Sequence, residues 1–344
     1  MAALEKAFTN DITTRNIVYN ASATHLKKII TEAHPESFAG ATSAVLNARM
    51  AAQSAVNNHV TAAHGTGLSS SSEEAQWKTW GQFFGNTASE SSHDNANGYD
   101  ADTAGIIFGM DRLLTDNFRL GFAYTYMQIN VDAKGSNNKN NINTNLIILY
   151  SDYIFDSMYL DGHVSYGFNH YDVDRYMTVL GKKATDDFGG YTLNLGTEFG
   201  RNFDLEPAVI TPFLGLDYTH IDTDSYTESG AGISNLIIDG QDNDIFTSIL
   251  GVRVTATFGR FTPKMRASWI HDWNQEKINT NAKFATGGAA LSSDAAKRDY
   301  DKWNVGLDLE VQVSDAFKLS LDCDYVGSPH MHNFGGAVRA VYEF

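Results

Sequence analysis

The sequence predicts an all-β transmembrane barrel of about twelve antiparallel strands, with an N-terminal α-helix through its lumen. Three observations favour this fold. From Gln76 onward, apolar and polar residues alternate with period two, which is typical of strands with two different faces. Short turns and long polar loops alternate between the predicted strands, as in outer-membrane barrels. Aromatic residues make up 12% of the 344 residues, whereas Pro contributes only 5, a composition that suits many strands.

The strands follow from the alternating segments. In the clearest one, Trp303, Val305 and Leu307 are apolar and the interleaved residues are polar or small. The predicted strands span 75–86, 100–113, 118–131, 142–155, 158–175, 186–202, 210–226, 244–258, 261–274, 300–313, 317–326 and 333–344. The alternation is less clean in 142–155 and 158–175. An even strand count places both ends of the barrel segment at the same, periplasmic end.

The first 64 residues follow a different pattern. A helix-compatible segment runs from 4 to 34 and ends before Pro35, and a second runs from 41 to 64 and is closed by Gly65. Small residues dominate the second segment, which contains eight alanines. At 1.5 Å per residue it would be about 35 Å long, close to the thickness of a bilayer. We therefore divide the chain into 1–40, 41–74 and 75–344, although residues 1–64 are also compatible with a helical extension on the surface.

The apolar strand faces have two interpretations. In a water-soluble β-sandwich or propeller they pack together inside, whereas in a membrane barrel they face lipid and the polar faces ring a lumen. Charges of both signs on the polar faces favour the membrane barrel. The charged residues expected to face the lumen are Arg119, Glu198, Arg253, Lys264, Arg266, Asp308, Glu310, Asp322 and Arg339. The aromatic residues expected to form interfacial girdles are Trp77, Tyr99, Tyr126, Tyr153, Tyr159, Phe203, Tyr226, Phe258, Phe261, Trp273 and Phe317.

Charge and cysteine content exclude several classes of function. The formal net charge is −16 and the pI is about 5.0, so we expect no nucleic-acid partner, because phosphate binding requires a positive surface. The single cysteine, Cys323, excludes an intramolecular disulfide and a multi-cysteine metal site. No Gly-rich phosphate loop is apparent, and we expect no cofactor.

Several segments carry a resemblance to a known family. They are WKTWGQFFG at 77–85, AGIIFGMD at 104–111, LTDNFRLGFAY at 114–124, and the C-terminal series Gly336, Val338, Ala340, Tyr342 and Phe344. Together with the Ala-rich helix, residues 65–344 resemble the translocator domains of type Va autotransporters (type V secretion). The resemblance implies that Val338, Ala340, Tyr342 and Phe344 form the assembly signal that the barrel-assembly machinery reads in the outer membrane.

The resemblance also implies a role for each predicted part. Residues 1–40 would be the end of a passenger or a linker, 41–74 the pore helix and its linker, and 75–344 the outer-membrane barrel. The pore helix would carry Arg49, Asn57 and Asn58, with Arg49 among lumen carboxylates, where an ion pair is better than a lone buried charge. The implied partners are an N-terminal passenger, the barrel-assembly machinery, periplasmic chaperones, and outer-membrane lipid and lipopolysaccharide. The barrel is expected to be a monomer.

Catalysis is not expected. Some relatives in the family cut the pore helix between two asparagines, but the matching pair here is Ala44-Val45, and Asn57-Asn58 lies about three turns later. An outer-membrane phospholipase is similar in having His-x-Ser on one strand, as at His163-x-Ser165. This pair is expected to point into the lumen, away from lipid. A phospholipase-like barrel enzyme and a simple diffusion porin are the alternative functions.

No metal site is expected either. His330-x-His332 would bind a metal only weakly, because loop histidines are normally solvated. Paired aspartates in predicted polar loops offer oxygen ligands for divalent cations near lipopolysaccharide, namely Asp172 and Asp174, Asp222 and Asp224, and Asp242 and Asp244. We interpret these aspartates as solvated charges that oppose aggregation.

Overall fold

The fold is described from a computed structural model. It describes residues 11–32, 37–62, 77–94, 96–274, 279–287, 290–294 and 296–344. Within these ranges, three α-helices precede the strands: α2 (Ile12–Tyr19), α3 (Ala23–Glu32) and α4 (Ser37–Ala62). In the described ranges, no helix combines the length and the hydropathy that a membrane-crossing helix needs. The predicted linker and Gly65 lie outside these residues.

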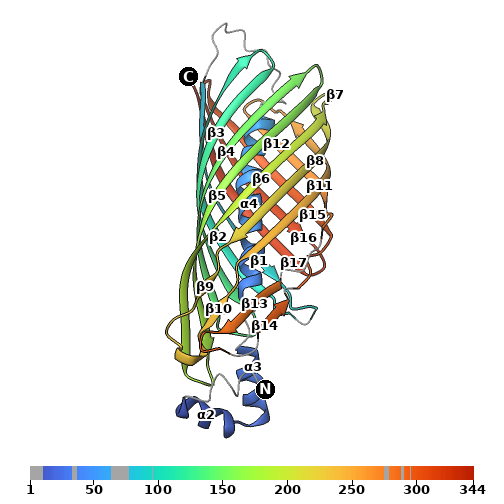
Figure 1. Ribbon diagram of the computed structural model, residues 1–344. Helices are drawn as coiled ribbons and strands as arrows, with labels where there is room; N and C mark the ends of the chain where they lie inside the picture. Colours follow the sequence, from blue (N-terminus) through green and yellow to red (C-terminus); the bar gives the residue numbers. More distant parts are fainter. Residues whose placement is uncertain are drawn as a thin grey trace.

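Twelve long strands form one closed antiparallel barrel (Figure 1). They are β1 (Trp77–Glu90), β2 (Tyr99–Thr115), β3 (Phe118–Ala133), β4 (Lys139–Phe155), β5 (Met158–Met177), β6 (Lys182–Arg201), β8 (Ala208–Thr223), β11 (Gln241–Ala256), β12 (Phe261–Asp272), β15 (Asp301–Ser314), β16 (Phe317–Gly327) and β17 (Met331–Glu343). Each long strand pairs with the next, and β1 pairs with β17 to close the ring. The predicted twelve-stranded barrel is confirmed.

The barrel has two different ends. Trp77 and Phe344 lie together at one end, where each backbone N–H donates to the other residue's carbonyl; we call it the terminal end. The opposite end, where β1 turns into β2, is the loop end. The short strand β7 (Phe203–Leu205) pairs with the beginning of β8 at the terminal end.

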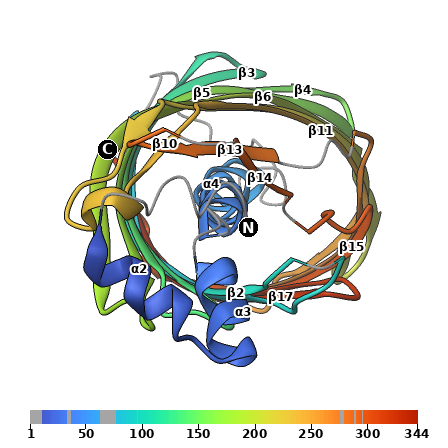
Figure 2. The same ribbon diagram turned by 60° about the horizontal axis from the view of Figure 1, so that its bottom comes forward.

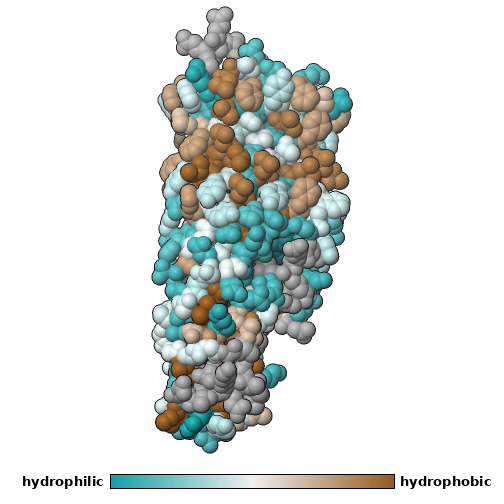
Figure 3. All heavy atoms as spheres, in the orientation of Figure 1, coloured by the Kyte–Doolittle hydropathy of each residue, from teal (hydrophilic) through white to brown (hydrophobic). Residues whose placement is uncertain are grey.

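Side chains alternate between the two faces of the barrel wall, as period-two strands require. In β3, Leu120, Phe122 and Tyr124 are exposed, whereas Arg119 and Ala123 are buried in the lumen. The exposed apolar residues gather in the upper half of the view in Figure 3, towards the terminal end, and hydrophilic residues dominate below them. This band is the surface that faces lipid.

The strands extend further towards the loop end than predicted. The connections expected at 132–141 and 176–185 shrink because β3, β4, β5 and β6 continue into them. Asp172, Asp174, Asp222, Asp242 and Asp244 lie on strands β5, β8 and β11 rather than in loops, so the interpretation of these residues as loop aspartates is wrong. Polar strand ends escape a pattern search that relies on apolar alternation.

Two long connections form a second sheet at the loop end. Its strands are β9 (Tyr226–Thr227), β10 (Leu236–Ile238), β13 (Asn279–Phe284) and β14 (Leu291–Asp294), and a short 3-10 helix, η1 (Gly232–Ser234), precedes β10. Figure 2 shows β10 and β13 lying across the mouth beside α4. We call this four-stranded sheet the loop-end cap. The sequence predicted only polar loops here.

Three residues assigned to the aromatic girdle lie elsewhere. Tyr99 and Tyr159 are buried, at 4% and 1% exposure, and Tyr159 donates a hydrogen bond to Glu198 in the lumen. Tyr226 stacks on Phe188 with ring centroids 4.3 Å apart, in the loop-end cap. Position near a strand end identifies a girdle residue only if the side chain also faces outward.

Candidate functional site: the helix-filled lumen

The central feature of the lumen is α4, which runs along the barrel axis (Figure 2). At the loop end, the Asn47 side chain donates to the Tyr99 hydroxyl at 3.4 Å. Near the terminal end, His59 stacks on Trp80 with centroids 4.6 Å apart. The helix begins at Ser37 rather than at residue 41, so its first turn lies within the segment predicted as a stub.

One side of α4 packs against an apolar inner wall, formed by the inward faces of β1 to β4; we call it the helix-bearing wall. Its buried apolar side chains include Ile107, Met127, Ile129, Ile142, Leu146 and Ile148. The helix meets them with Ala41, Ala44, Val45, Ala48, Ala52, Ala55 and Val56. Alanine lets the helix approach closely, and the apolar contact removes both surfaces from water. This wall explains the poor alternation in 142–155, because β4 is apolar on both faces there.

The remaining strands form the charged wall, which we define as the inward faces of β5, β6, β8, β11, β12, β15, β16 and β17. Eight of the nine residues predicted to face the lumen lie on it: Glu198, Arg253, Lys264, Arg266, Asp308, Glu310, Asp322 and Arg339. The ninth, Arg119, lies on β3 at the terminal end of the helix-bearing wall. All nine side chains are buried or nearly so.

Ion pairs neutralise these charges. Arg253 lies 3.1 Å from Glu198, and Lys264 lies 3.1 Å from Glu310. Arg339, which is fully buried, lies 3.2 Å from Asp308. Removing one partner from such a pair leaves an uncompensated buried charge, so these residues depend on one another.

The polar side of α4 faces the charged wall. Arg49 Nη2 lies 3.0 Å from Asp217 Oδ1, so the helix cation does lie beside a lumen carboxylate. Asn58 donates to Asp322 at 3.0 Å. Asn57 accepts a hydrogen bond from Gln53 within the helix at 2.8 Å, so its side-chain oxygen is bound by the helix itself.

A second cluster, not found by sequence reasoning, joins the helix to β2 and β3. His59 Nε2 lies 2.6 Å from Asp111, and Arg119 Nε lies 3.4 Å from the same carboxylate. The Tyr150 hydroxyl also donates to Asp111 at 3.0 Å. Asp111 occupies an inward register position on the predicted strand 100–113, which is the sequence feature that marks it as a lumen residue.

Between α4 and the charged wall lies a cavity of about 180 Å³, whose lining includes Arg49, Ala51, Asn57 and Asp217. A cavity of this volume has room for on the order of ten waters. The helix therefore reduces the lumen to a narrow gap along one side, lined by both apolar and polar side chains.

At the loop end, α3 is fixed to the barrel by a buried arginine on β5. Arg175 Nε donates to Glu228 at 2.7 Å, and its Nη1 donates to the backbone carbonyl of Glu32 at 2.9 Å. The Glu32 carboxylate accepts a hydrogen bond from Thr178. Apolar side chains surround this contact, among them Ile29, Met177, Leu236 and Phe284. We call this group, together with Arg175 and Glu228, the docking cluster.

The helix α2 is also attached at the loop end. Asp11 caps its N-terminus by accepting from Thr14 N at 3.1 Å, and it forms an ion pair with Lys182 of β6 at 3.1 Å. These hydrogen bonds from Thr14, with the contribution of Lys182, hold the pKa of the Asp11 carboxyl well below its ordinary value. The described part of the predicted segment 4–34, residues 11–32, thus contains two short helices, separated at Asn20–Ser22.

The His-x-Ser pair does not have the geometry of a lipase site. His163 Nε2 lies 2.8 Å from Asn194 Oδ1 and 3.6 Å from Asp217 Oδ2. Ser165 is buried in the barrel interior. Within the described part of the chain, no hydrogen bond connects His163 with Ser165, and both side chains face away from lipid.

Fold and lumen together define a class of protein: an outer-membrane β-barrel whose pore contains a helix of its own N-terminal segment. Residues 79–324 match the family model "Autotransporter beta-domain". The chain therefore belongs to the autotransporter β-domain family, as the sequence motifs predicted.

Known relatives agree with this assignment. The chain is 25% identical over 284 residues to outer membrane protein A of Rickettsia conorii, covering 76% of this chain and 14% of the relative. It is 25% identical over 249 residues to an extracellular serine protease of Serratia marcescens, covering 70% of this chain and 24% of the relative. The chain thus spans less than a quarter of the length of these relatives.

Solved structures show the same fold. The translocator domain of the autotransporter NalP from Neisseria meningitidis superposes with a TM-score of 0.73 at 14% identity, covering 90% of this chain and 100% of that chain. The transport unit of AIDA-I from Escherichia coli gives a TM-score of 0.61 at 14% identity, covering 90% and 99%. The protein is a translocator barrel of the bacterial outer membrane that provides a pore for passenger export, and the family implies a passenger linked N-terminally.

Proposed function

We propose that the chain is divided as the sequence suggests: residues 1–40 are the last part of an exported passenger or its linker, 41–74 the pore helix and linker, and 75–344 the membrane anchor. The observation that carries this proposal is the path of α4, from the loop end beside Tyr99 to the terminal end beside Trp80. A chain that has been exported through its own barrel would take this path, with the passenger outside and the last segment left in the pore.

In this proposal the barrel acts without catalysis. Export requires a lumen that admits a polypeptide, and the paired charges and the cavity beside the helix support that role. The buried, separated His163 and Ser165 argue against the phospholipase alternative. The helix argues against a simple diffusion porin, because it fills most of the lumen.

Single-channel conductance tests whether α4 blocks the pore. A variant lacking residues 37–62 should conduct several-fold more current in planar bilayers than the whole chain, because the helix no longer occupies the pore. A matched variant lacking only residues 11–32 keeps α4 and should conduct like the whole chain. Equal currents from all three proteins would contradict the proposal.

Surface display tests the direction of export. A small reporter fused ahead of residue 11 should be cleaved by protease added to intact cells, whereas the barrel should stay protected. A reporter that becomes cleavable only after the outer membrane is opened would refute export through this barrel.

We propose further that the C-terminal strand engages the barrel-assembly machinery through Val338, Ala340, Tyr342 and Phe344, after delivery by periplasmic chaperones. Val338, Tyr342 and Phe344 are exposed on β17 or directly after it. Deleting Phe344 should sharply lower the amount of folded barrel in the outer membrane. The substitution Phe334→Ala, at an exposed aromatic of the same strand, should have little effect, and equal losses would argue against a terminal signal.

The outer surface of the barrel supports the proposals for lipid contact and for the oligomeric state. The apolar band supports contact with outer-membrane lipid and lipopolysaccharide, and the closed sheet leaves no unpaired edge for a second copy, which supports a monomer. Light scattering in detergent should give one barrel per particle.

A further inference from the structure

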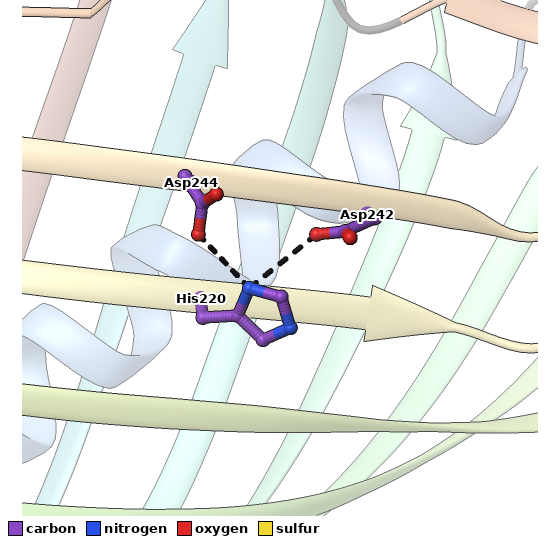
Figure 4. A group of neighbouring side chains, drawn as sticks. All are labelled: His220, Asp242 and Asp244. Atoms are coloured by element: carbon purple, nitrogen blue, oxygen red, sulfur yellow. Dashed lines mark hydrogen bonds and ion pairs between the residues drawn. The ribbon is translucent and has the colours of Figure 1, made fainter.

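A group of three potential metal ligands lies on the outer surface of the barrel, near the loop end. His220 is on β8, and Asp242 and Asp244 are on the neighbouring strand β11. Figure 4 shows the His220 imidazole between the two carboxylates, with one ring nitrogen directed at both. His220 Nδ1 lies 2.9 Å from Asp244 Oδ1 and 3.3 Å from Asp242 Oδ1.

These distances suit a bound cation. Zinc takes imidazole nitrogen and carboxylate oxygen ligands at ~2.0–2.2 Å, which places neighbouring ligand atoms about 3.0–3.5 Å apart. The three candidate ligand atoms all lie within 4.8 Å of one another. A small side-chain adjustment therefore brings all three onto one ion.

The other ring nitrogen of His220 is oriented by a tyrosine. Its Nε2 lies 3.2 Å from the Tyr191 hydroxyl. Metal-binding histidines commonly donate their second ring N–H to an oxygen acceptor, usually a carboxylate, a backbone carbonyl or water, which fixes the tautomer and leaves the first nitrogen free to bind. Tyr191 would play that part here.

The strand register provides an independent reason for a cation. Asp242 lies directly opposite Asp222, and Asp244 lies opposite His220. Like charges directly opposite each other destabilise a strand pair. Among the described residues, His220 is the only basic side chain within 4 Å of the carboxylates of Asp242 and Asp244. A divalent ion would neutralise this excess of negative charge.

The surroundings of the site place it at the rim of the lipid-facing band. The preceding outward positions on β8 are Leu214, Leu216 and Tyr218, all exposed, and His220 is the next. The exposed fractions of the side chains are 19% for His220, 69% for Asp242 and 54% for Asp244. With three protein ligands, the ion keeps an open position towards the outside.

The geometry points to a divalent cation site of the zinc class formed by His220, Asp242 and Asp244, which joins β8 to β11 at the root of the loop-end cap. The strand β11 begins at Gln241, and the Gln241 side chain donates to Thr280 of β13 in the cap at 2.5 Å. An ion that fixes β8 to β11 therefore also steadies the base of the sheet beside the docking cluster.

The test uses untagged full-length chain refolded in detergent, because a polyhistidine tag binds zinc itself. After equilibration with ZnCl₂ and removal of free metal, elemental analysis should find one more zinc per barrel in the parent than in a His220→Gln, Asp244→Asn double variant. Calorimetric titration should show at least tenfold weaker binding for Asp242→Asn, and for Tyr191→Phe a 10–100-fold loss.

The matched control is Asp301→Asn, which removes the carboxylate from another outward pair. His271 Nδ1 lies 2.8 Å from Asp301, but the described residues provide no third ligand there, so zinc binding should be unchanged. All variants should retain the gel mobility of a folded barrel. The proposal is overturned if the double variant keeps the same zinc content as the parent, or if Asp301→Asn lowers it equally.

Discussion

The two inner walls of this barrel hold the same helix by different physical means. The helix-bearing wall uses close apolar packing along most of the helix, with Ala48 and Met127 both at 0% exposure, and adds the His59–Asp111 contact near the terminal end. The charged wall uses ion pairs and hydrogen bonds such as Arg49–Asp217, and it leaves a cavity beside the helix. The stability gained from apolar packing depends on how closely the two surfaces fit. The stability of a buried ion pair depends on the presence of both charged partners. The helix-bearing wall therefore fixes the position of the helix, and the charged wall leaves a cavity open beside it.

This difference suits a barrel that must first pass a chain and then close. An entirely apolar lumen would bind any apolar segment in transit, and an entirely charged one would hold an Ala-rich helix poorly. The predictions that follow test whether the two walls respond to mutation as differently as their chemistry implies.

The largest effect is expected at Arg339 on the charged wall. Replacing Arg339 with Leu removes the guanidinium beside Asp308 and leaves that buried carboxylate with Lys264 alone, at 3.4 Å. The barrel should lose about 3 kcal/mol, the lower end of the range for breaking a buried pair, because one of the two cations beside Asp308 remains. The urea midpoint of the detergent-refolded barrel, followed by its heat-modifiable gel mobility, measures this loss.

Lys318→Leu is the matched control for that measurement. Lys318 also pairs with a lumen carboxylate, Glu310, at 3.3 Å, but its side chain is 22% exposed. The expected loss is about 1 kcal/mol or less, because solvent screens the pair. If both variants lost the same stability, burial would not be what makes the charged wall sensitive.

Arg49 comes next, because it joins the helix to the charged wall. Arg49→Met should cost roughly 1.5–3 kcal/mol, the range for a hydrogen bond to a charged group. Asp217 keeps hydrogen bonds such as that from Asn194 at 2.9 Å, so the loss stays below that at Arg339. Single-channel recordings should show more frequent opening. Asn57→Ala, which removes a contact within the helix only, should leave the recordings unchanged.

Overpacking tests the helix-bearing wall. Ala48→Phe should destabilise the barrel by about 1–3 kcal/mol, because the added ring has no space against β3 and β4. Ala51 is the matched position, since it lines the cavity on the other side of the helix. Ala51→Phe should be close to neutral. A greater loss for Ala51→Phe in the same urea titration would reverse the assignment of the two faces.

The sequence predicted the charged wall more completely than the helix-bearing wall. An alternating strand with charges on one face, such as the segment at 303–313, identifies its inward residues directly. On β4 both faces are apolar, so Ile148 in the lumen and Ile147 in lipid look alike by hydropathy. The irregular alternation in residues 142–155 is the sequence feature that reflects the helix-bearing wall.

Contacts between residues far apart in the chain could not be predicted from the sequence. The His59–Asp111 contact joins residues 52 positions apart, and Arg175 joins β5 to Glu228 and to the carbonyl of Glu32. Periodicity places each residue on a face of its own element, but it does not identify which helix turn meets which strand. The loop-end cap was missed because its strands are only two to six residues long, which is too short for a period-two pattern to stand out.

The smallest effect concerns the point where the loops of the two walls meet. His93, between β1 and β2, directs its two ring nitrogens at the carbonyls of Ser91 and Lys297, each at 2.9 Å. Both nitrogens can donate only if the ring is protonated. Burial opposes the charge, but the two carbonyls outweigh it, with help from Glu90 and Asp94, and raise the pKa of His93 above its ordinary value.

The sign of the pH dependence follows from that raised pKa. Protonated His93 stabilises the loop contact fully below the unfolded pKa of about 6.5, and the contribution is lost as the pH rises through the folded pKa. Because the His93 side chain is only partly buried and solvent screens its charge, the effect should be under about 1 kcal/mol. Trypsin cleavage after Lys297 reports it as the ratio of the rates for parent and His93→Gln. This ratio should rise towards one between pH 6 and pH 8, whereas a ratio constant with pH would show that His93 does not connect the two walls.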